Sequence, residues 1–334
     1  MRVLSVAFAL VSFGTSVATS GQTFQEFALP RPGSAPSSIV AGPDHAMWFT
    51  EFRGNAIGRC TLSGEIREFV LPMPPRYPRS ITVGADGNLW FTTTASGYAA
   101  VNRITPAGEL TEFPLPDSSS SPGVIVAGPD TALWFTELAG GIGRITTAGA
   151  ITEFPLPASA GVRGIATGPD GNLWFLDQNR TIGSISPAGE VHQYPLAESV
   201  LPMEIVAGPD GALWFTDFGA GRLFRFALAG EVSSVPLQTP LGITIGPDNT
   251  LWITEFGYHV FEPIPLPTTP GRIANVTTSA SVREFPVPNP LSEPTGIATA
   301  DDGSVWFTQS AGNSIVRLTR VPRPPRHPRR VSFR

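Results

Sequence analysis

The sequence predicts an all-β protein, a seven-bladed β-propeller of four-stranded antiparallel blades whose ring is closed when the N-terminal strand joins the last blade. Three observations lead to this prediction. One tryptophan-containing motif occurs seven times, each repeat holds four short β-rich segments, and a second motif recurs seven times out of step with the first. The 334 residues are 41% hydrophobic and 15% charged, so the chain can bury a core.

The tryptophan motif recurs at a nearly constant spacing. Each copy places a Gly- and Asp-rich turn before an apolar run, as in "GPDGALWFTD" at residues 208–217. The seven tryptophans are Trp48, Trp90, Trp134, Trp174, Trp214, Trp252 and Trp306. A period of roughly forty residues is typical of repeat proteins. Because turn residues recur every eight to twelve positions or so, the repeats consist of strands, and helical repeats are excluded.

Four strands can be assigned within one repeat. In residues 161–196 the segments "GVRGIAT", "LWFLD", "TIGSIS" and "EVHQYPL" are the predicted strands, and "GPDGN" and "PAG" are turns. Four-stranded sheets repeated about an axis form a propeller. The Trp-Phe pair found in six of the seven second strands is expected to fill the gaps between neighbouring blades, which requires no ligand.

Segments of the type Glu-Phe-x-Leu-Pro predict how the ring closes. One copy, at residues 26–30, precedes the first tryptophan motif, and no copy follows the last tryptophan motif. The N-terminal strand is therefore expected to complete the last blade and to cover edge strands that would otherwise promote aggregation.

The two ends of the chain have their own composition. Residues 1–20 have the pattern of a signal peptide: Arg2, a short apolar run, and small residues at the end. Residues 21–319 form the predicted propeller, and residues 320–334 form an arginine- and proline-rich tail that we expect to be disordered. No apolar run is long enough to cross a bilayer, so we expect an exported monomer, secreted or periplasmic, that does not span a membrane.

Charge argues against nucleic acid as a partner. The chain has 22 Lys+Arg, six of them in the tail, against 27 Asp+Glu, and an acidic body repels a phosphate backbone. The single cysteine, Cys60, excludes an internal disulfide, and the four histidines have no zinc-site spacing. The expected partner is a small-molecule or peptide-like ligand.

Strand direction predicts where such a ligand would bind. The starts of the inner strands and the ends of the second strands should surround one mouth of the central channel. Five of the seven second strands end in an acid. Because these ring acids fall at equivalent places, we expect them to approach one another around the axis, and two readings remain open. The acids bind Mg²⁺, Ca²⁺ or a cationic ligand, or each one caps the amides of a nearby loop. The metal-ligand candidates are Glu51, Glu137, Asp177, Asp217, Glu255 and Glu293.

The inner strands start with residues that differ from blade to blade, and a divergent position in a duplicated scaffold is where an individual binding site is expected. These starts are Ser37, Arg79, Gly123, Arg163, Met203, Leu241 and Thr295. Arg79 and Arg163 are expected either to contact an anionic group or to pair with the ring carboxylates. The ligand-binding candidates are Arg79, Arg163, Tyr258, Thr295 and Gln309.

One loop is much longer than its counterparts. The segment from Glu255 to Ile273 contains Tyr258 and His259 and is a candidate lid over the channel mouth, although a loop without function fits equally well. His259 is the candidate catalytic base.

The repeat "GPDGNLWF", with "IGRIT" and "ITEFPLP" after its copies, resembles the virginiamycin B (streptogramin B) lyase family from about Phe24 to Leu318. The resemblance implies a seven-bladed propeller and an Mg²⁺-assisted elimination that opens cyclic depsipeptides. In that family a His follows Glu-Pro at the entry to the last blade, and a Glu ends the next strand. Here Glu293 and Pro294 are kept, but Thr295 and Gln309 stand at those two positions.

Two functions follow from this comparison of motifs. The first is an exported lyase-like propeller without lyase activity, which binds a ligand or partner at the channel mouth, because neither Thr nor Gln titrates near neutral pH. The alternative is an active metal-assisted enzyme, either a divergent C–O lyase or a hydrolase similar to gluconolactonase-type propellers, with His259 as the base.

Overall fold

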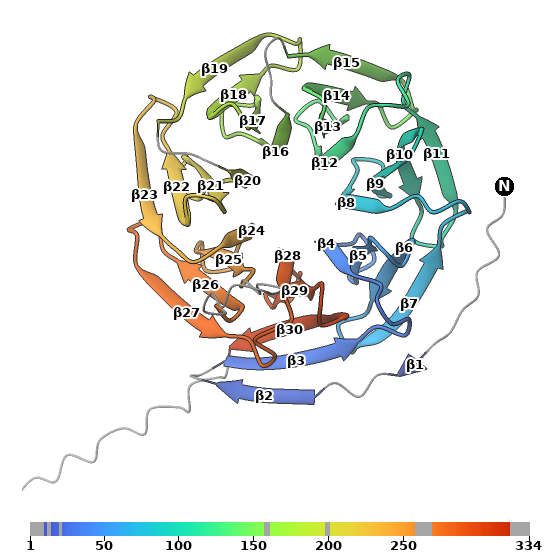
Figure 1. Cartoon of the computed structure of the whole chain (residues 1–334), viewed down its shortest axis with the longest axis vertical. Helices are drawn as coiled ribbons and strands as arrows, with labels where there is room; N and C mark the ends of the chain where they lie inside the picture. Colours follow the sequence, from blue (N-terminus) through green and yellow to red (C-terminus); the bar gives the residue numbers. More distant parts are fainter. Residues whose placement is uncertain are drawn as a thin grey trace, which may run out of the picture.

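A computed structural model describes residues 10–11, 15–19, 22–156, 161–197, 201–257 and 269–320. Seven antiparallel sheets are arranged as blades in a ring around a central axis (Figure 1). The innermost strand of each sheet faces the axis, and the chain runs around the ring once. The predicted all-β, seven-bladed propeller is confirmed.

The strand bounds, from the innermost to the outermost strand of each blade, follow the repeats. Blades 1 to 3 are β4 (Pro36–Ala41), β5 (Met47–Glu51), β6 (Ala56–Cys60), β7 (Glu65–Val70); β8 (Pro78–Val83), β9 (Leu89–Ala95), β10 (Tyr98–Ile104), β11 (Leu110–Pro114); β12 (Pro122–Ala127), β13 (Leu133–Glu137), β14 (Gly141–Ile145), β15 (Ile151–Pro155). Blades 4 to 6 are β16 (Val162–Thr167), β17 (Leu173–Asp177), β18 (Thr181–Ile185), β19 (Val191–Pro195); β20 (Pro202–Ala207), β21 (Leu213–Asp217), β22 (Arg222–Phe226), β23 (Val232–Pro236); β24 (Pro240–Ile245), β25 (Leu251–Glu255), β26 (Arg272–Val276), β27 (Val282–Pro286).

The seventh blade joins the two ends of the chain, as predicted. It consists of β28 (Pro294–Thr299), β29 (Val305–Gln309), β30 (Ser314–Arg320) and β3 (Gln22–Ala28). β3 pairs antiparallel with β30 in the register Phe24↔Leu318. Two further strands within residues 1–20 were not expected: β1 (Leu10–Val11) pairs with β7, and β2 (Thr15–Thr19) pairs with β3.

The core lies between the blades, and the second strand of each blade supplies its aromatic residues. Every side chain of β5 is buried, and the same holds for the equivalent residues of the other blades. Trp48 stacks on Phe69 of the outer strand at 5.3 Å between ring centroids. Phe49 packs on Gly58, where any larger side chain would collide with its ring. The Trp-Phe pairs are therefore packing residues, which bury large apolar rings.

A β-bulge in every inner strand shapes the wall of the channel. In blade 5 the pairing with the second strand shifts between Pro202 and Ile205, and the equivalent shift occurs in all seven blades. Thr216 of the second strand bridges this bulge. Its hydroxyl accepts from the backbone N–H of Glu204 at 3.2 Å and donates to the carbonyl oxygen of Leu241 in the next blade at 2.6 Å. A bulge bends its strand and redirects the side chains within it.

Candidate functional site

The candidate site is a cavity of about 290 Å³ at the axis. All seven variable inner-strand positions line it, accompanied by residues of the adjacent bulges. The lining residues are Ser37, Ser38, Arg79, Ser80, Gly123, Val124, Leu138, Arg163, Met203, Glu204, Leu241, Thr295 and Gly296. Its position follows from strand register, since the first residue of each inner strand pairs with the last residue of the second strand, as Pro36 does with Glu51. The cavity thus lies at the mouth where the sequence placed it.

Two arginines give the cavity a positive side. Arg79 of blade 2 and Arg163 of blade 4 line it, and Gly123 of blade 3 lies at the equivalent position between them. Burial, together with the nearby charge of Arg163, lowers the pKa of Arg79. Among the described residues neither arginine forms an ion pair, so the alternative that they pair with the ring carboxylates is wrong.

Each arginine is held by neutral groups. The Arg79 guanidinium lies 5.7 Å from the ring centre of Phe52, and its Nε has no hydrogen-bond partner among the described residues. With the Gln178 amide turned so that its carbonyl oxygen faces Arg163, that oxygen accepts from Nε at 2.8 Å and from Nη2 at 3.2 Å. Within the part of the chain that the structure describes, both positive charges therefore remain without a counter-ion.

Glu204 is a cavity residue that the sequence reasoning missed. The residue is half-buried, yet its carboxyl group is enclosed by protein, and this burial raises its pKa to about 7. Its Oε2 accepts from the backbone N–H of Ile243 in the next blade at 3.2 Å. The signal was present in the sequence, because "PMEIV" carries the single acid found at the third position of the seven inner strands. A carboxyl that titrates near neutral pH inside a cavity is a feature of functional sites.

The acids that end the second strands do not line this cavity. Glu51 is buried, and burial first and the charge of Glu68 second raise its pKa to about 7. Burial and Glu153 raise the pKa of Glu137 to about 7 in the same way. In both cases the neighbouring carboxylate belongs to the outer strand of the same blade. The expectation that these acids approach one another around the axis is therefore wrong, because the inner strands stand between them and the axis.

Several of these residues cap loops instead. Asp217 Oδ1 accepts from the backbone N–H groups of Leu201 and Ala220 at 3.0 and 2.8 Å. Glu255 Oε1 accepts from the N–H of Gln238 at 2.6 Å, and burial raises the pKa of Glu255 to about 7. Asp177 Oδ1 accepts from the N–H of Asn179 at 2.8 Å. These contacts match the loop-capping reading of the acids.

The residues at the two positions that the resemblance singled out are both internally bonded. Thr295 shares a hydrogen bond with Thr308 at 2.7 Å, and Gln309 donates to Ser292 Oγ at 2.6 Å. Thr295 lines the cavity, whereas Gln309 is fully buried and is not among the lining residues. Tyr258 and His259, with the rest of the candidate lid, lie outside the described residues.

The described side chains do not form a cation site. Within the described ranges no group of three or more His, Cys, Asp or Glu residues is close enough to hold a metal ion. Glu293 is half-buried just before β28, and its carbonyl oxygen accepts from the N–H of Ser310 at 3.0 Å. The donor set expected for Mg²⁺ or Ca²⁺, several oxygens around one point, is not assembled by these residues.

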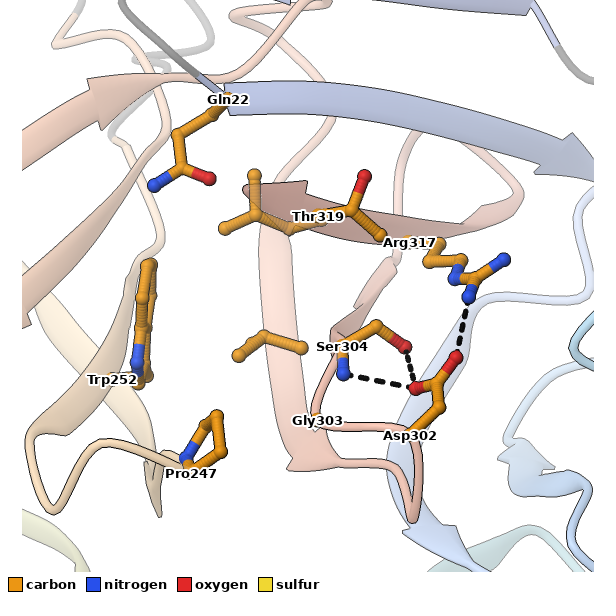
Figure 2. Close-up of a pocket in the computed structure, with 10 residues that line it drawn as sticks. Gln22, Pro247, Trp252, Asp302, Gly303, Ser304, Arg317 and Thr319 are labelled. Atoms are coloured by element: carbon orange, nitrogen blue, oxygen red, sulfur yellow. Dashed lines mark hydrogen bonds and ion pairs between the residues drawn. The ribbon is translucent and has the colours of Figure 1, made fainter. Parts of the chain in front are cut away.

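A second cavity, of about 270 Å³, lies between blades 6 and 7 and is shown in Figure 2. In blades 1 to 4 the turn between the third and fourth strands carries a glycine that packs on the outer aromatic of the preceding blade, as Gly64 does on Phe27. Blade 7 has no such turn, because β30 and β3 come from opposite ends of the chain. Gln22 Oε1 and Trp252 Nε1, at the edge of this gap, have no hydrogen-bond partner. We attribute the cavity to ring closure.

The fold and the axial cavity define a class, the seven-bladed propellers with a ligand-sized pocket at the channel mouth. Solved structures narrow this class. A streptogramin B lyase structure is 31% identical with a TM-score of 0.81, covering 91% of this chain and 100% of its own. Virginiamycin B lyase from Staphylococcus aureus is 31% identical with a TM-score of 0.80, covering 89% and 99%. A catalytically inactive histidine-to-alanine variant of that lyase with quinupristin is 30% identical with a TM-score of 0.80, and it covers the same shares of the two chains.

The model of the virginiamycin B lyase family matches residues 15–162 and 158–320 of this chain. The chain belongs to the virginiamycin B lyase family. Among the residues that the structure describes, no helix is long and apolar enough to cross a membrane.

Proposed function

We propose that this chain is an exported member of its family that binds a ligand in the axial cavity and does not catalyse the lyase reaction. The observation that carries the proposal is the lining of the cavity. Its walls differ from blade to blade and present two arginines that form no ion pair with any described residue, while the scaffold around them repeats. Concave sites with a few polar groups in an apolar wall are the usual ligand sites of proteins.

The family's acid–base positions support the absence of lyase activity. Thr295 and Gln309 stand where the resemblance places His and Glu, and neither side chain exchanges a proton near neutral pH. Both are engaged in internal hydrogen bonds. Export is supported by the signal-peptide pattern of residues 1–20.

Turnover and binding of quinupristin test this proposal. We expect no ring-opened product by chromatography above the buffer control, with the Staphylococcus aureus lyase as the positive control. Binding is measured as a thermal shift with quinupristin, inorganic phosphate and succinate. We expect at least one probe to stabilise the protein, and Leu241→Trp, which fills the cavity, to abolish that shift. Leu228→Trp is the matched control at an exposed position.

Two outcomes would contradict the proposal. Ring-opened quinupristin would show that lyase activity is retained, and the absence of any shift with all three probes would remove the ligand-binding role.

A second candidate function is catalysis by Glu204, and its raised pKa favours it. A carboxyl group with a pKa of about 7 that lines a cavity can act as a general base at neutral pH. This reading needs a substrate whose proton comes within hydrogen-bond reach of Glu204. A screen of lactones and cyclic depsipeptides tests it: turnover lost in Glu204→Gln would establish catalysis, and no turnover would leave the binding function.

A further inference from the structure

We propose that the axial cavity takes a small anion and holds its carboxylate or phosphate group between Arg79 and Arg163. This inference rests on the proposed function, that the cavity is a ligand site, and adds the chemical class of the ligand.

Three consecutive blades place two arginines and one glycine at the wall of the cavity. Arg79, Gly123 and Arg163 occupy the same position on the inner strands of blades 2, 3 and 4. The middle residue has no side chain, and a methyl group on it would lie 2.6 Å from Thr136 Oγ1, so Gly123 adds nothing that stands between the two arginines. Apolar Val124 and Leu138 contribute to the wall beside it. Two arginines that line one cavity, near enough for the charge of Arg163 to lower the pKa of Arg79, are suited to a planar carboxylate or a phosphate.

The arginines of this cavity differ from three arginines of the third strands. On the opposite face, Arg59, Arg144 and Arg225 each bond an aspartate of their own blade at 2.6 to 2.7 Å. Arg79 and Arg163 have no carboxylate partner among the described residues, and Arg79 Nε has no hydrogen-bond partner at all. Both arginines are half-buried, and holding two like charges near each other there without a counter-ion is unfavourable. A bound anion would offset that repulsion and complete the missing bonds.

Other lining groups are compatible with an anion. Glu204 is the single carboxyl group among the lining residues, and with a pKa of about 7 it is largely uncharged in mildly acidic solution. Ser37 and Ser80 add hydroxyl groups to the wall. The volume of about 290 Å³ is at the lower end of ligand pockets, which favours a small dicarboxylate or a phosphate compound over a large ring.

Calorimetric titration of the full chain with inorganic phosphate and with succinate tests the inference. We expect at least one of the two anions to bind, and Arg79→Gln and Arg163→Gln each to raise its Kd by about tenfold or more, the loss typical of a charge-assisted hydrogen bond. Arg53→Gln is the control, because Arg53 is an exposed arginine on the same face that does not line the cavity. The Kd of the Arg53→Gln variant for either anion should equal that of the parent protein.

A second variant keeps both arginines, so a loss of binding in it does not depend on how the protein tolerates removal of an arginine. Gln178→Glu gives Arg163 an internal carboxylate partner, so it should weaken anion binding without removing a cavity residue. No binding of either anion, or equal Kd values in all variants, would overturn the inference. If quinupristin binds and the anions do not, this inference fails while the proposed function stands. If quinupristin is opened, the proposed function fails whatever the anions do.

Discussion

At the scale of single residues, four glutamates stand out because burial raises the pKa of each to about 7. They are Glu51, Glu137, Glu204 and Glu255. The ordinary value is 4.5, so in the range between the two values the folded protein holds protons that the unfolded chain has released. Stability should therefore fall as pH rises from about 4.5 to about 7 and then level off. The turn aspartates have lowered pKa values, and their contribution is lost only as pH falls below about 4.

Glu137→Gln tests this at one position. Glu137 Oε1 is buried without a partner, and the outer-strand Glu153 opposes its ionisation. The neutral amide removes the cost of a buried charge, so we expect the variant to have a higher Tm than the parent at pH 8 and nearly the same Tm at pH 5. The measurement is thermal denaturation across this range, with exposed Glu231→Gln as the control. A difference in Tm between variant and parent that does not change with pH would contradict the raised pKa of Glu137.

At the scale of the element, the inner strands depend on their threonine bridges. Six second strands carry the bridging threonine, and blade 4 has Leu176 instead. There the bulge contains Gly164, and a methyl group on it would lie 2.7 Å from the carbonyl oxygen of Met203 in the next blade. Glycine therefore permits a close approach of two inner strands where the hydroxyl is absent. The bridges hold neighbouring blades in register around the cavity.

Thr254→Val removes one bridge while keeping the shape of the side chain. The Thr254 hydroxyl accepts from the N–H of Gly242 at 2.8 Å and donates to the carbonyl oxygen of Thr295 at 2.5 Å. Both backbone groups would lose a buried partner, at roughly 1–3 kcal/mol for each. We expect the free energy of unfolding, measured with denaturant, to fall by about 2 kcal/mol or more. Thr152→Val on an exposed outer strand is the control, and equal losses in both variants would contradict the bridging role.

At the scale of the whole molecule, the ring is closed without a covalent link. β3 pairs with β30 over seven residues and places Phe24 and Phe27 in the core, with Phe27 stacked on Trp306. The blade that joins the two ends therefore depends on a segment of seven residues near the N-terminus. Without it, β30 would become an exposed edge strand.

Two shortened chains test this closure. A chain that begins at Gln22 keeps β3, so we expect it to fold with nearly the parent Tm. A chain that begins at Leu29 lacks β3 and its two phenylalanines, and we expect it to unfold at lower temperature or to aggregate through the edge of β30. Thermal denaturation and size-exclusion chromatography distinguish the two. Cooperative, parent-like unfolding of the shorter chain would show that closure by β3 is dispensable.

The sequence by itself determined the ring of blades, because each repeat encodes its own turns and its own strands, whose successive side chains face opposite sides of the blade. Glycine- and aspartate-rich turns mark the strand ends, and the strands assigned in residues 161–196 agree with β16 to β19 to within one residue at each end. The offset of the outer-strand motif was enough to predict the closure. The variable inner-strand positions also identified the cavity lining, since all seven line it.

Only the tertiary structure decided which charged groups meet. The ring acids were expected around the axis, but each second strand lies behind an inner strand. Glu51 therefore pairs with Arg31, and Asp217 accepts from the backbone N–H of Leu201. Glu204 became a cavity residue because the bulge and its threonine bridge set the direction of its side chain. Arg79 and Arg163 come to line one cavity although they lie on different blades, with Gly123 of a third blade between them. Such distances depend on how blades pack, which a one-dimensional pattern does not contain.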